Sequence, residues 1–171
     1  MLIVPLINSF SQDVIKLMLN TEKSFIEYEA KHFLHEWTGK NNKIKGVIFI
    51  NNEEGKIALV ANIVDFDSGI SNRDSNALRV LDAFKHRQVR FYSDQIIISD
   101  NTISFDGELE FHGIKVNKRL DASYFEEGKT INIEGNFSIV LTDFDIKLPS
   151  LMLKKIDDFA KISYKLIFEK I

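Results

Sequence analysis

The chain has 171 residues, of which 44% are hydrophobic, and this length and composition fit one globular domain with a buried core. The 22 Lys and Arg and 25 Asp and Glu give a net charge of -3, which disfavours nucleic-acid binding because no broad basic field faces a phosphate backbone. The absence of Cys excludes disulfides, thiol catalysis and thiolate metal sites. Phe is the favoured aromatic, with 14 copies against one Trp and four Tyr, which indicates an oily interior with few polar groups.

The first twelve residues, Met1 to Gln12, resemble the apolar and cleavage regions of a secretory signal that lacks its basic leading segment. We interpret residues 1–12 as a truncated signal peptide and residues 13–171 as the folded domain, which predicts export. The alternative interpretation is a short N-terminal strand of the domain. No other stretch of the sequence approaches the roughly 20 apolar residues that a membrane-spanning helix needs.

Most of the remaining sequence alternates between apolar and polar residues with a period of two, which is typical of strands with one buried and one wet face. Apolar residues recur at helical spacing from Ala77 to Phe84, which predicts one amphipathic helix over roughly residues 73–85 with Ser71 or Asn72 as its N-cap. We expect this helix to form a lid or plug against the sheet. The expected strands are an edge strand at residues 14–19, followed by residues 25–30, 43–50, 56–64, 88–93, 95–99, 101–112, 114–124, 130–142 and 161–169.

About eight antiparallel strands, joined mostly by hairpins, predict a mainly β fold in the form of an up-and-down β-barrel, because closure removes the exposed edges of the sheet. A barrel of this size is either filled by its own side chains or holds one small ligand. Small residues at inward positions, namely Ala61, Gly107 and Gly135, favour a cavity over a filled barrel. The inward residues that we expect to contact a ligand are Phe105, Leu109, Phe111, Ile131, Ile133, Phe137, Ile139, Tyr164, Leu166 and Phe168.

The sequence contains no nucleophile motif, phosphate-binding glycine loop or zinc signature, so we expect no catalytic residue, no cofactor and no enzyme activity. His32 and His35 are three residues apart. On a single strand such positions face opposite ways, so we also expect no metal site.

Two polar segments near the expected ends of the barrel each allow more than one role. Arg73-Asp74 near the helix start allows either a salt bridge that fixes the helix to the barrel, or a contact of Arg73 with a polar head group at the barrel mouth. His112 ends a long strand beside Gly113, which favours a hydrogen-bonded corner over a catalytic role.

Three segments carry a family resemblance, and they are Asp67-Ser-Gly-Ile-Ser-Asn-Arg-Asp74, Phe105-Asp-Gly-Glu-Leu-Glu-Phe-His-Gly113 and Leu141-Thr-Asp-Phe-Asp-Ile146. Their order resembles the YceI-like family of bacterial polyisoprenoid-binding proteins, and the likeness extends over about residues 24–169. The family usually follows its histidine-glycine pair with a small apolar residue, threonine and lysine, whereas this chain has Ile114-Lys-Val116. Residues 149–156 resemble an extra loop that one branch of the family carries before its last strand.

The resemblance implies a lipocalin-like barrel in the periplasm that holds a long isoprenoid chain, such as a quinone tail or prenyl lipid, in an apolar tunnel without catalysis. It implies Arg73, Asp74, His112 and Gly113 as signature residues, so we add Arg73 and His112 to the expected ligand contacts. Binding and transport of such a lipid is the leading hypothesis, and transient membrane contact and a homodimer are compatible with it. The alternative is a side-chain-filled barrel that acts as a stress-related protein-interaction module. A lipid hydrolase or isomerase lacks a recognisable nucleophile or base.

Overall fold

The computed structural model describes residues 14–33, 35–51, 54–151 and 153–171, so the expected signal segment at residues 1–12 lies outside the described residues. Within the described part, no helix is long and apolar enough to cross a membrane. The strands are β1 (Ile15–Leu19), β2 (Phe25–His32), β3 (His35–Asn41), β4 (Lys45–Ile50), β5 (Gly55–Asn62), β6 (Gln88–Ser99), β7 (Thr102–Phe111), β8 (Ile114–Glu127), β9 (Thr130–Val140), β10 (Ser150–Leu151), β11 (Lys154–Lys155) and β12 (Phe159–Lys170). The helical elements are the α-helix α1 (Ser71–Val80) and the short 3-10 turns η1 (Thr21–Lys23), η2 (Ile63–Asp65) and η3 (Leu141–Phe144).

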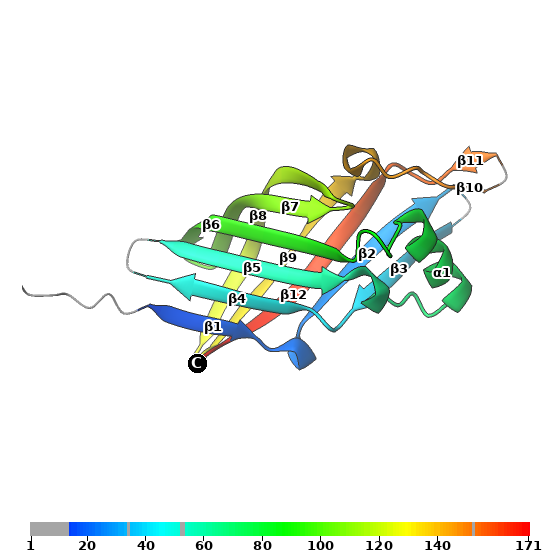
Figure 1. Ribbon diagram of the computed structural model, residues 1–171. Helices are drawn as coiled ribbons and strands as arrows, with labels where there is room; N and C mark the ends of the chain where they lie inside the picture. Colours follow the sequence, from blue (N-terminus) through cyan, green and yellow to red (C-terminus); the bar gives the residue numbers. More distant parts are fainter. Residues whose placement is uncertain (1–13, 34, 52–53, 152) are drawn as a thin grey trace, which may run out of the picture.

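Eight strands form a closed antiparallel barrel in the order β1-β4-β5-β6-β7-β8-β9-β12 (Figure 1). The ring closes because β1 pairs with β4 on one side and with the end of β12 on the other. Most neighbours in the ring are also neighbours in sequence, as hairpin connections require. The predicted mainly β, up-and-down barrel with one helix is therefore confirmed. The first strand was expected at an edge, and this expectation is wrong because the long β12 supplies its second partner.

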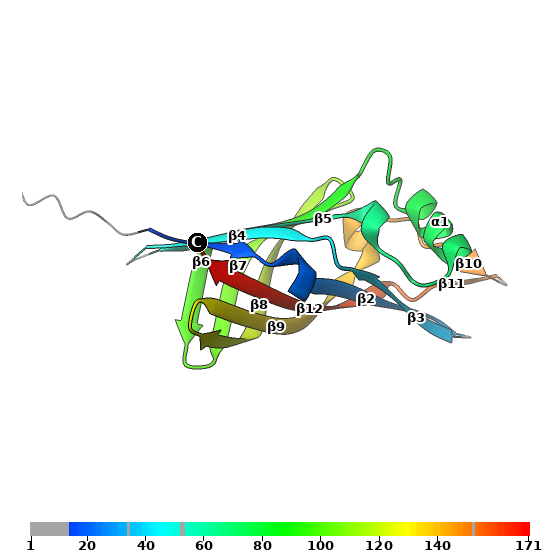
Figure 2. The ribbon, with the colours of Figure 1, turned by 90° about the horizontal axis from the view of Figure 1, so that it is seen from below.

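A second hairpin, β2–β3, extends the sheet at one end of the barrel. β2 pairs with the first half of β12, from Ala160 to Lys165, and β3 pairs with β2. The sequence did not predict β3, because its inward positions are Trp37, Gly39 and Asn41 and so lack a regular apolar alternation. Figure 2 shows this hairpin at the same end of the molecule as α1 and the β10–β11 hairpin, away from the C-terminus.

Other elements differ from the prediction at their ends. Residues 88–99 form one strand rather than two, since the bulge between Ser93 and Gln95 keeps both halves paired with β7. The buried Ser93 hydroxyl stabilises this bulge by donating to the Asp106 or Gln95 carbonyl and accepting from the Gln95 N–H. β9 ends at Val140, and the expected extra loop at residues 149–156 contains the β10–β11 hairpin.

The helix α1 begins at Ser71 and is shorter than predicted. Its N-cap residue is Ile70, which offers no side-chain acceptor, so neither Ser71 nor Asn72 has the expected capping role. Instead the Asp74 carboxylate accepts a hydrogen bond of 3.1 Å from the Ser68 N–H and ties the helix to the preceding loop. The helix ends before Asp82, whose positive φ of 42° turns the chain toward β6.

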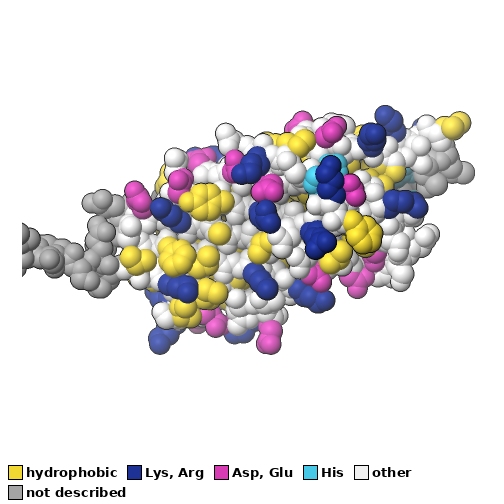
Figure 3. Space-filling view, in the orientation of Figure 1, with side chains coloured by type: hydrophobic (Ala, Val, Ile, Leu, Met, Phe, Trp, Pro, Cys, Tyr) yellow, Lys and Arg dark blue, Asp and Glu magenta, His cyan; other side chains and the backbone are white. Residues whose placement is uncertain are grey.

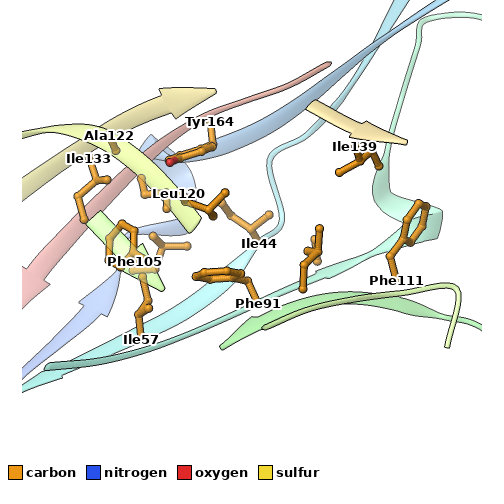
Figure 4. Packing of buried hydrophobic residues seen from close by; sticks show 14 of the residues in the cluster. Ile44, Ile57, Phe91, Phe105, Phe111, Leu120, Ala122, Ile133, Ile139 and Tyr164 are labelled. Atoms are coloured by element: carbon orange, nitrogen blue, oxygen red, sulfur yellow. The ribbon is translucent and has the colours of Figure 1, made fainter. Parts of the chain in front are cut away.

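Several of the most deeply buried side chains lie at the end of the barrel where β1 completes the ring. Ile57, Phe105 and Ile133 are gathered there, whereas Phe111 and Ile139 lie toward the other end (Figure 4). Phe168 and Ile133 are 0% exposed, and Phe105 is 2% exposed. The inward alternation of the strands therefore produces a packed floor at this end.

Candidate ligand-binding cavity

A cavity of about 710 Å³ extends from this floor to α1 and the β2–β3 hairpin. Its wall is mostly apolar and comes from the inward residues of β5 to β9 and β12, with Phe91 and Leu120 among them. The helix closes part of the opening through Ala77 and Leu78, which gives it the predicted position of a lid against the sheet. Such a volume is in the usual range of small-molecule sites, which are largely apolar with a few polar groups.

The expected ligand contacts fall into three groups in the structure. The residues that line the cavity are Phe105, Leu109, Phe111, Phe137, Ile139, Tyr164, Leu166 and Arg73. Ile131, Ile133 and Phe168 point inward but belong to the packed floor. His112 lies in the turn between β7 and β8 and does not line the cavity. The alternation along each strand correctly predicts which side chains point inward. It does not predict whether an inward side chain lies in the packed floor or at the cavity.

Four residues that surround the mouth form what we call the mouth cluster, namely Tyr28, Trp37, Phe66 and Arg73. The Tyr28 and Phe66 ring centroids are 5.8 Å apart, and the Arg73 guanidinium lies 5.7 Å from the Trp37 ring centroid. Burial and the nearby Asp74 carboxylate raise the pKa of Tyr28, while a hydrogen bond with the Trp37 side chain opposes them. Sequence reasoning placed only Arg73 at the mouth. The alternation of Tyr28 with the charged residues Glu27 and Glu29 could have indicated that Tyr28 points inward. No comparable pattern in the sequence surrounds Trp37.

Arg73 forms no ion pair with any described residue. The interpretation of Arg73-Asp74 as a salt bridge that fixes the helix to the barrel is therefore wrong for the described part of the chain. Arg73 contacts β3 through the Trp37 ring instead, and a cation over an aromatic face contributes about 0.5–1 kcal/mol at an exposed site. Its guanidinium donors thus remain available at the mouth.

Side chains of neighbouring strands occupy the space left by two of the small inward residues. A Cβ at Gly135 would lie 2.5 Å from the Tyr164 hydroxyl, and one at Gly107 would lie 2.8 Å from the Phe91 ring. Ala61 lines the cavity directly. The cavity therefore does not arise where the two glycines predicted it, yet its existence contradicts the premise of a barrel filled by side chains.

The Tyr164 hydroxyl is buried and has no hydrogen-bond partner among the described residues. Burial, with a smaller effect of the Asp121 carboxylate, raises its pKa to about 12. The wall of the cavity around Tyr164 is thus apolar, since burial favours the neutral form of this phenol.

His112 is a structural corner. Its Nδ1 lies 2.8 Å from the Phe144 carbonyl oxygen, and its ring centroid is 4.3 Å from that of His86. His112 and Gly113 both have positive φ, and a Cβ at Gly113 would come within 2.8 Å of the His86 ring. This geometry fits the predicted hydrogen-bonded corner, and it supports the wall because Phe144 packs on Phe111 at 5.4 Å between ring centroids.

His32 and His35 lie on two strands, so the assumption that they share one strand was wrong. They are cross-strand partners at the end of the β2–β3 hairpin, with ring centroids 6.1 Å apart. The His32 Nε2 lies 3.2 Å from the Lys154 carbonyl oxygen. Within the described ranges, no group of three or more His, Asp or Glu side chains could hold a metal ion.

A closed antiparallel barrel with one helix-capped apolar cavity places the chain in the class of which the lipocalins are the best-known example. Residues 17–168 match the family model of the YceI-like domain. The chain therefore belongs to the YceI-like domain family, and the resemblance noted in the sequence is confirmed.

Solved structures with the same fold come from several bacteria. BcnA of Burkholderia cenocepacia has a TM-score of 0.78 at 17% identity, covering 87% of this chain and 98% of that chain. A polyisoprenoid binding domain from Saccharophagus degradans has a TM-score of 0.71 at 13% identity, with 91% and 98% covered. The Campylobacter jejuni YCEI protein has a TM-score of 0.62 at 16% identity, with 78% and 84% covered. No curated protein sequence matches this chain. Identities this low show a shared fold alone.

Proposed function

We propose that the protein binds the apolar chain of an amphiphilic isoprenoid lipid, such as a quinone or prenyl lipid, without catalysing a reaction on it. The observation that carries this proposal is the helix-capped apolar cavity of about 710 Å³. Membership of the YceI-like family and the fold shared with a polyisoprenoid binding domain support the same ligand class. No arrangement of a nucleophile with an adjacent base lines the described cavity.

The energetics of such binding are favourable. Each buried methylene contributes about 0.8 kcal/mol, so ten buried carbons supply roughly 8 kcal/mol, which corresponds to about micromolar affinity. The flexible chain loses conformational freedom on binding, and carbons beyond the capacity of the cavity stay outside it. Affinity should therefore rise with chain length and then level off.

Arg73 is the residue that we assign to the polar head group. It lines the mouth, and its guanidinium is not engaged by a described carboxylate. An Arg fork suits a phosphate or another anionic oxygen group better than a neutral alcohol. We assign His112 to the support of the wall through Phe144 rather than to ligand contact.

The single Trp of the chain provides the test, because Trp37 lines the mouth. Quenching of its fluorescence by nitroxide-labelled prenols of increasing length should strengthen and then level off. The variant Ala61→Phe places a ring inside the cavity and should weaken binding of the long prenols by about tenfold or more, whereas Ala58→Phe adds the same ring on the outer face of β5 and should have no effect.

The same titration tests the contact between Arg73 and the lipid head group. Arg73→Met should weaken a prenyl phosphate by about tenfold and leave a neutral prenol unchanged, because only the phosphate gains a charge-assisted hydrogen bond. Equal affinity for short and long chains, or equal loss in Ala61→Phe and Ala58→Phe, would place the ligand outside the barrel.

Transport of the lipid in the periplasm, transient membrane contact and a homodimer belong to the same proposal. The signal-like residues 1–12 and the family support the compartment. Met18, Val47, Ala58 and Tyr92 are register neighbours on the outer face of β1, β4, β5 and β6. The exposure of Met18 and Tyr92 supports a face that a second copy could cover.

A further inference from the structure

Two hairpin ends are joined beyond the mouth of the barrel. The His32 Nε2 meets the Lys154 carbonyl oxygen, and the Asp157 N–H donates a 2.9 Å hydrogen bond to the Lys31 carbonyl oxygen. The Lys154 ammonium lies 4.5 Å from the Phe33 ring centroid. The ends of β2–β3 and β10–β11 therefore form one projection, which we call the double tip and define as Phe33, Leu153, Lys154 and Lys155.

The double tip exposes apolar side chains to water. Leu153 is 102% exposed and Phe33 is 50% exposed. Leu153 also has a φ of 66°, a backbone conformation that a branched L-residue rarely adopts. Its side chain is not part of the hydrophobic core of the described residues. Figure 3 shows a hydrophobic side chain at the far end of the molecule where this hairpin lies.

A third exposed apolar residue lies at the same end of the barrel. Phe84 is 93% exposed in the connection between α1 and β6. Gln88, the first residue of β6, pairs with Asn62 at the mouth end of β5, which fixes the end of this connection. The double tip and Phe84 are therefore two separate projections at the mouth end rather than one continuous groove.

Basic residues accompany these projections. Residues 147–155 contain Lys147, Lys154 and Lys155 and no Asp or Glu, although the whole chain has a net charge of -3. Lys85 and Arg87 lie beside Phe84 in the sequence. The acidic residues behind the hairpin are partly engaged inside the fold, since the Asp158 carboxylate accepts from the Thr142 N–H and hydroxyl.

We propose that the double tip and Phe84 dock the mouth of the barrel onto an anionic phospholipid bilayer. This inference rests on the proposed function, because a lipid carrier must exchange its cargo with a membrane. Isolated apolar side chains flanked by lysines suit an interface in which the apolar groups enter the acyl boundary and the ammonium groups meet phosphates. Separate projections fit a fluid bilayer better than the defined pockets of a protein partner.

Flotation with vesicles of phosphatidylcholine and phosphatidylglycerol in equal parts tests the proposal. Leu153→Asp should weaken binding by about tenfold or more, and Lys154→Glu with Lys155→Glu should have a similar effect that high salt reduces. The chain offers a matched control at the far end of the barrel, where Lys16 and Lys56 flank the exposed Phe49 on neighbouring strands. Phe49→Asp, and Lys16→Glu with Lys56→Glu, should leave vesicle binding unchanged.

Site-specific labels provide a second measurement, because the chain has no Cys. A polarity-sensitive dye attached through Leu153→Cys should shift to the blue on addition of these vesicles, and one attached through Ile97→Cys on β6 should not. Equal shifts at the two positions, equal losses in the two sets of variants, or no binding of the unchanged protein would overturn the proposal.

The Trp37 titration with vesicle-free prenols separates this inference from the proposed function. Tip variants that keep the quenching but lose the vesicles support the docking surface. An unchanged protein that binds vesicles through the tip yet shows no quenching would refute the lipid cavity and leave the docking surface supported.

Discussion

The two ends of the barrel contain the same long strands but differ in what pairs with β12. At the closed end, β1 lies between β4 and β12 and pairs with both, so the ring is complete. At the open end, β2 takes the place of β1 beside β12. There β3 joins the segment before α1 through the isolated bridge between Lys40 and Asp67, and the Asn41 amide donates to the carbonyl oxygen of Asn62 at the end of β5. The cavity therefore follows from a change of strand partner rather than from small side chains.

The change of partner is located at η1, between β1 and β2. The Asn20 N–H donates to the Ile167 carbonyl oxygen at 2.7 Å, and the Ser24 hydroxyl accepts from the Ile167 N–H at 2.9 Å and donates to the Asn20 carbonyl oxygen. A buried serine thus replaces the ladder bonds that an uninterrupted strand would make with β12. The interruption lets β2 diverge from β4 and opens the mouth.

The largest expected effect concerns the packing at the closed end. Phe168→Ala removes a ring that is 0% exposed and should lower the free energy of unfolding by about 3–5 kcal/mol, because the dense floor cannot close over the lost volume. Phe137→Ala, at the wall of the existing cavity, should cost only about 1 kcal/mol since little new void forms. Urea unfolding measures both, and equal losses would show that the two ends are packed alike.

A smaller effect is expected at the junction of the two ends. Ser24→Ala leaves the buried Ile167 N–H without its acceptor and should lower the free energy of unfolding by about 1–3 kcal/mol. Trp37 emission should change as well, because β2 carries the hairpin that holds it. Ser123→Ala is the control, since its hydroxyl also forms a cross-strand hydrogen bond, as donor to the Glu134 carbonyl oxygen, but lies in solvent. A loss no greater than that of the control would remove Ser24 from the explanation of the mouth.

How far the sequence predicted this arrangement differs between the two ends. The period-two alternation of β7, β9 and β12 was sufficient to predict the barrel and the inward direction of Phe105 and Leu166, because each strand has one face in water. The mouth was largely missed, since Trp37 and Tyr28 line it from a hairpin whose pairing depends on long-range contacts with β12. The predicted start of the helix was wrong because no side chain caps it. Asp74, inside the helix, accepts a hydrogen bond from the Ser68 N–H of the preceding loop instead.

The smallest expected effect lies between the two ends, at Tyr164. Its hydroxyl is buried without a partner, so Tyr164→Phe should raise the free energy of unfolding by about 1 kcal/mol at neutral pH. Burial raises the pKa of this phenol from 10.0 to about 12, which means that the folded state favours its neutral form. The stability that this preference provides is complete below about pH 10 and is lost as the pH rises toward about 12.

The advantage of Tyr164→Phe should therefore widen with pH, because the variant has no phenol at this position to ionise on unfolding. Urea unfolding at about pH 8 and about pH 11 should show a larger gap between the two proteins at the higher value. Tyr124 is the internal control, since its pKa is also raised to about 12 and it keeps a hydrogen bond to Glu126 in both proteins. A gap that stays constant with pH would mean that the Tyr164 hydroxyl meets water through the cavity, and the open end would then be wet down to the packed floor.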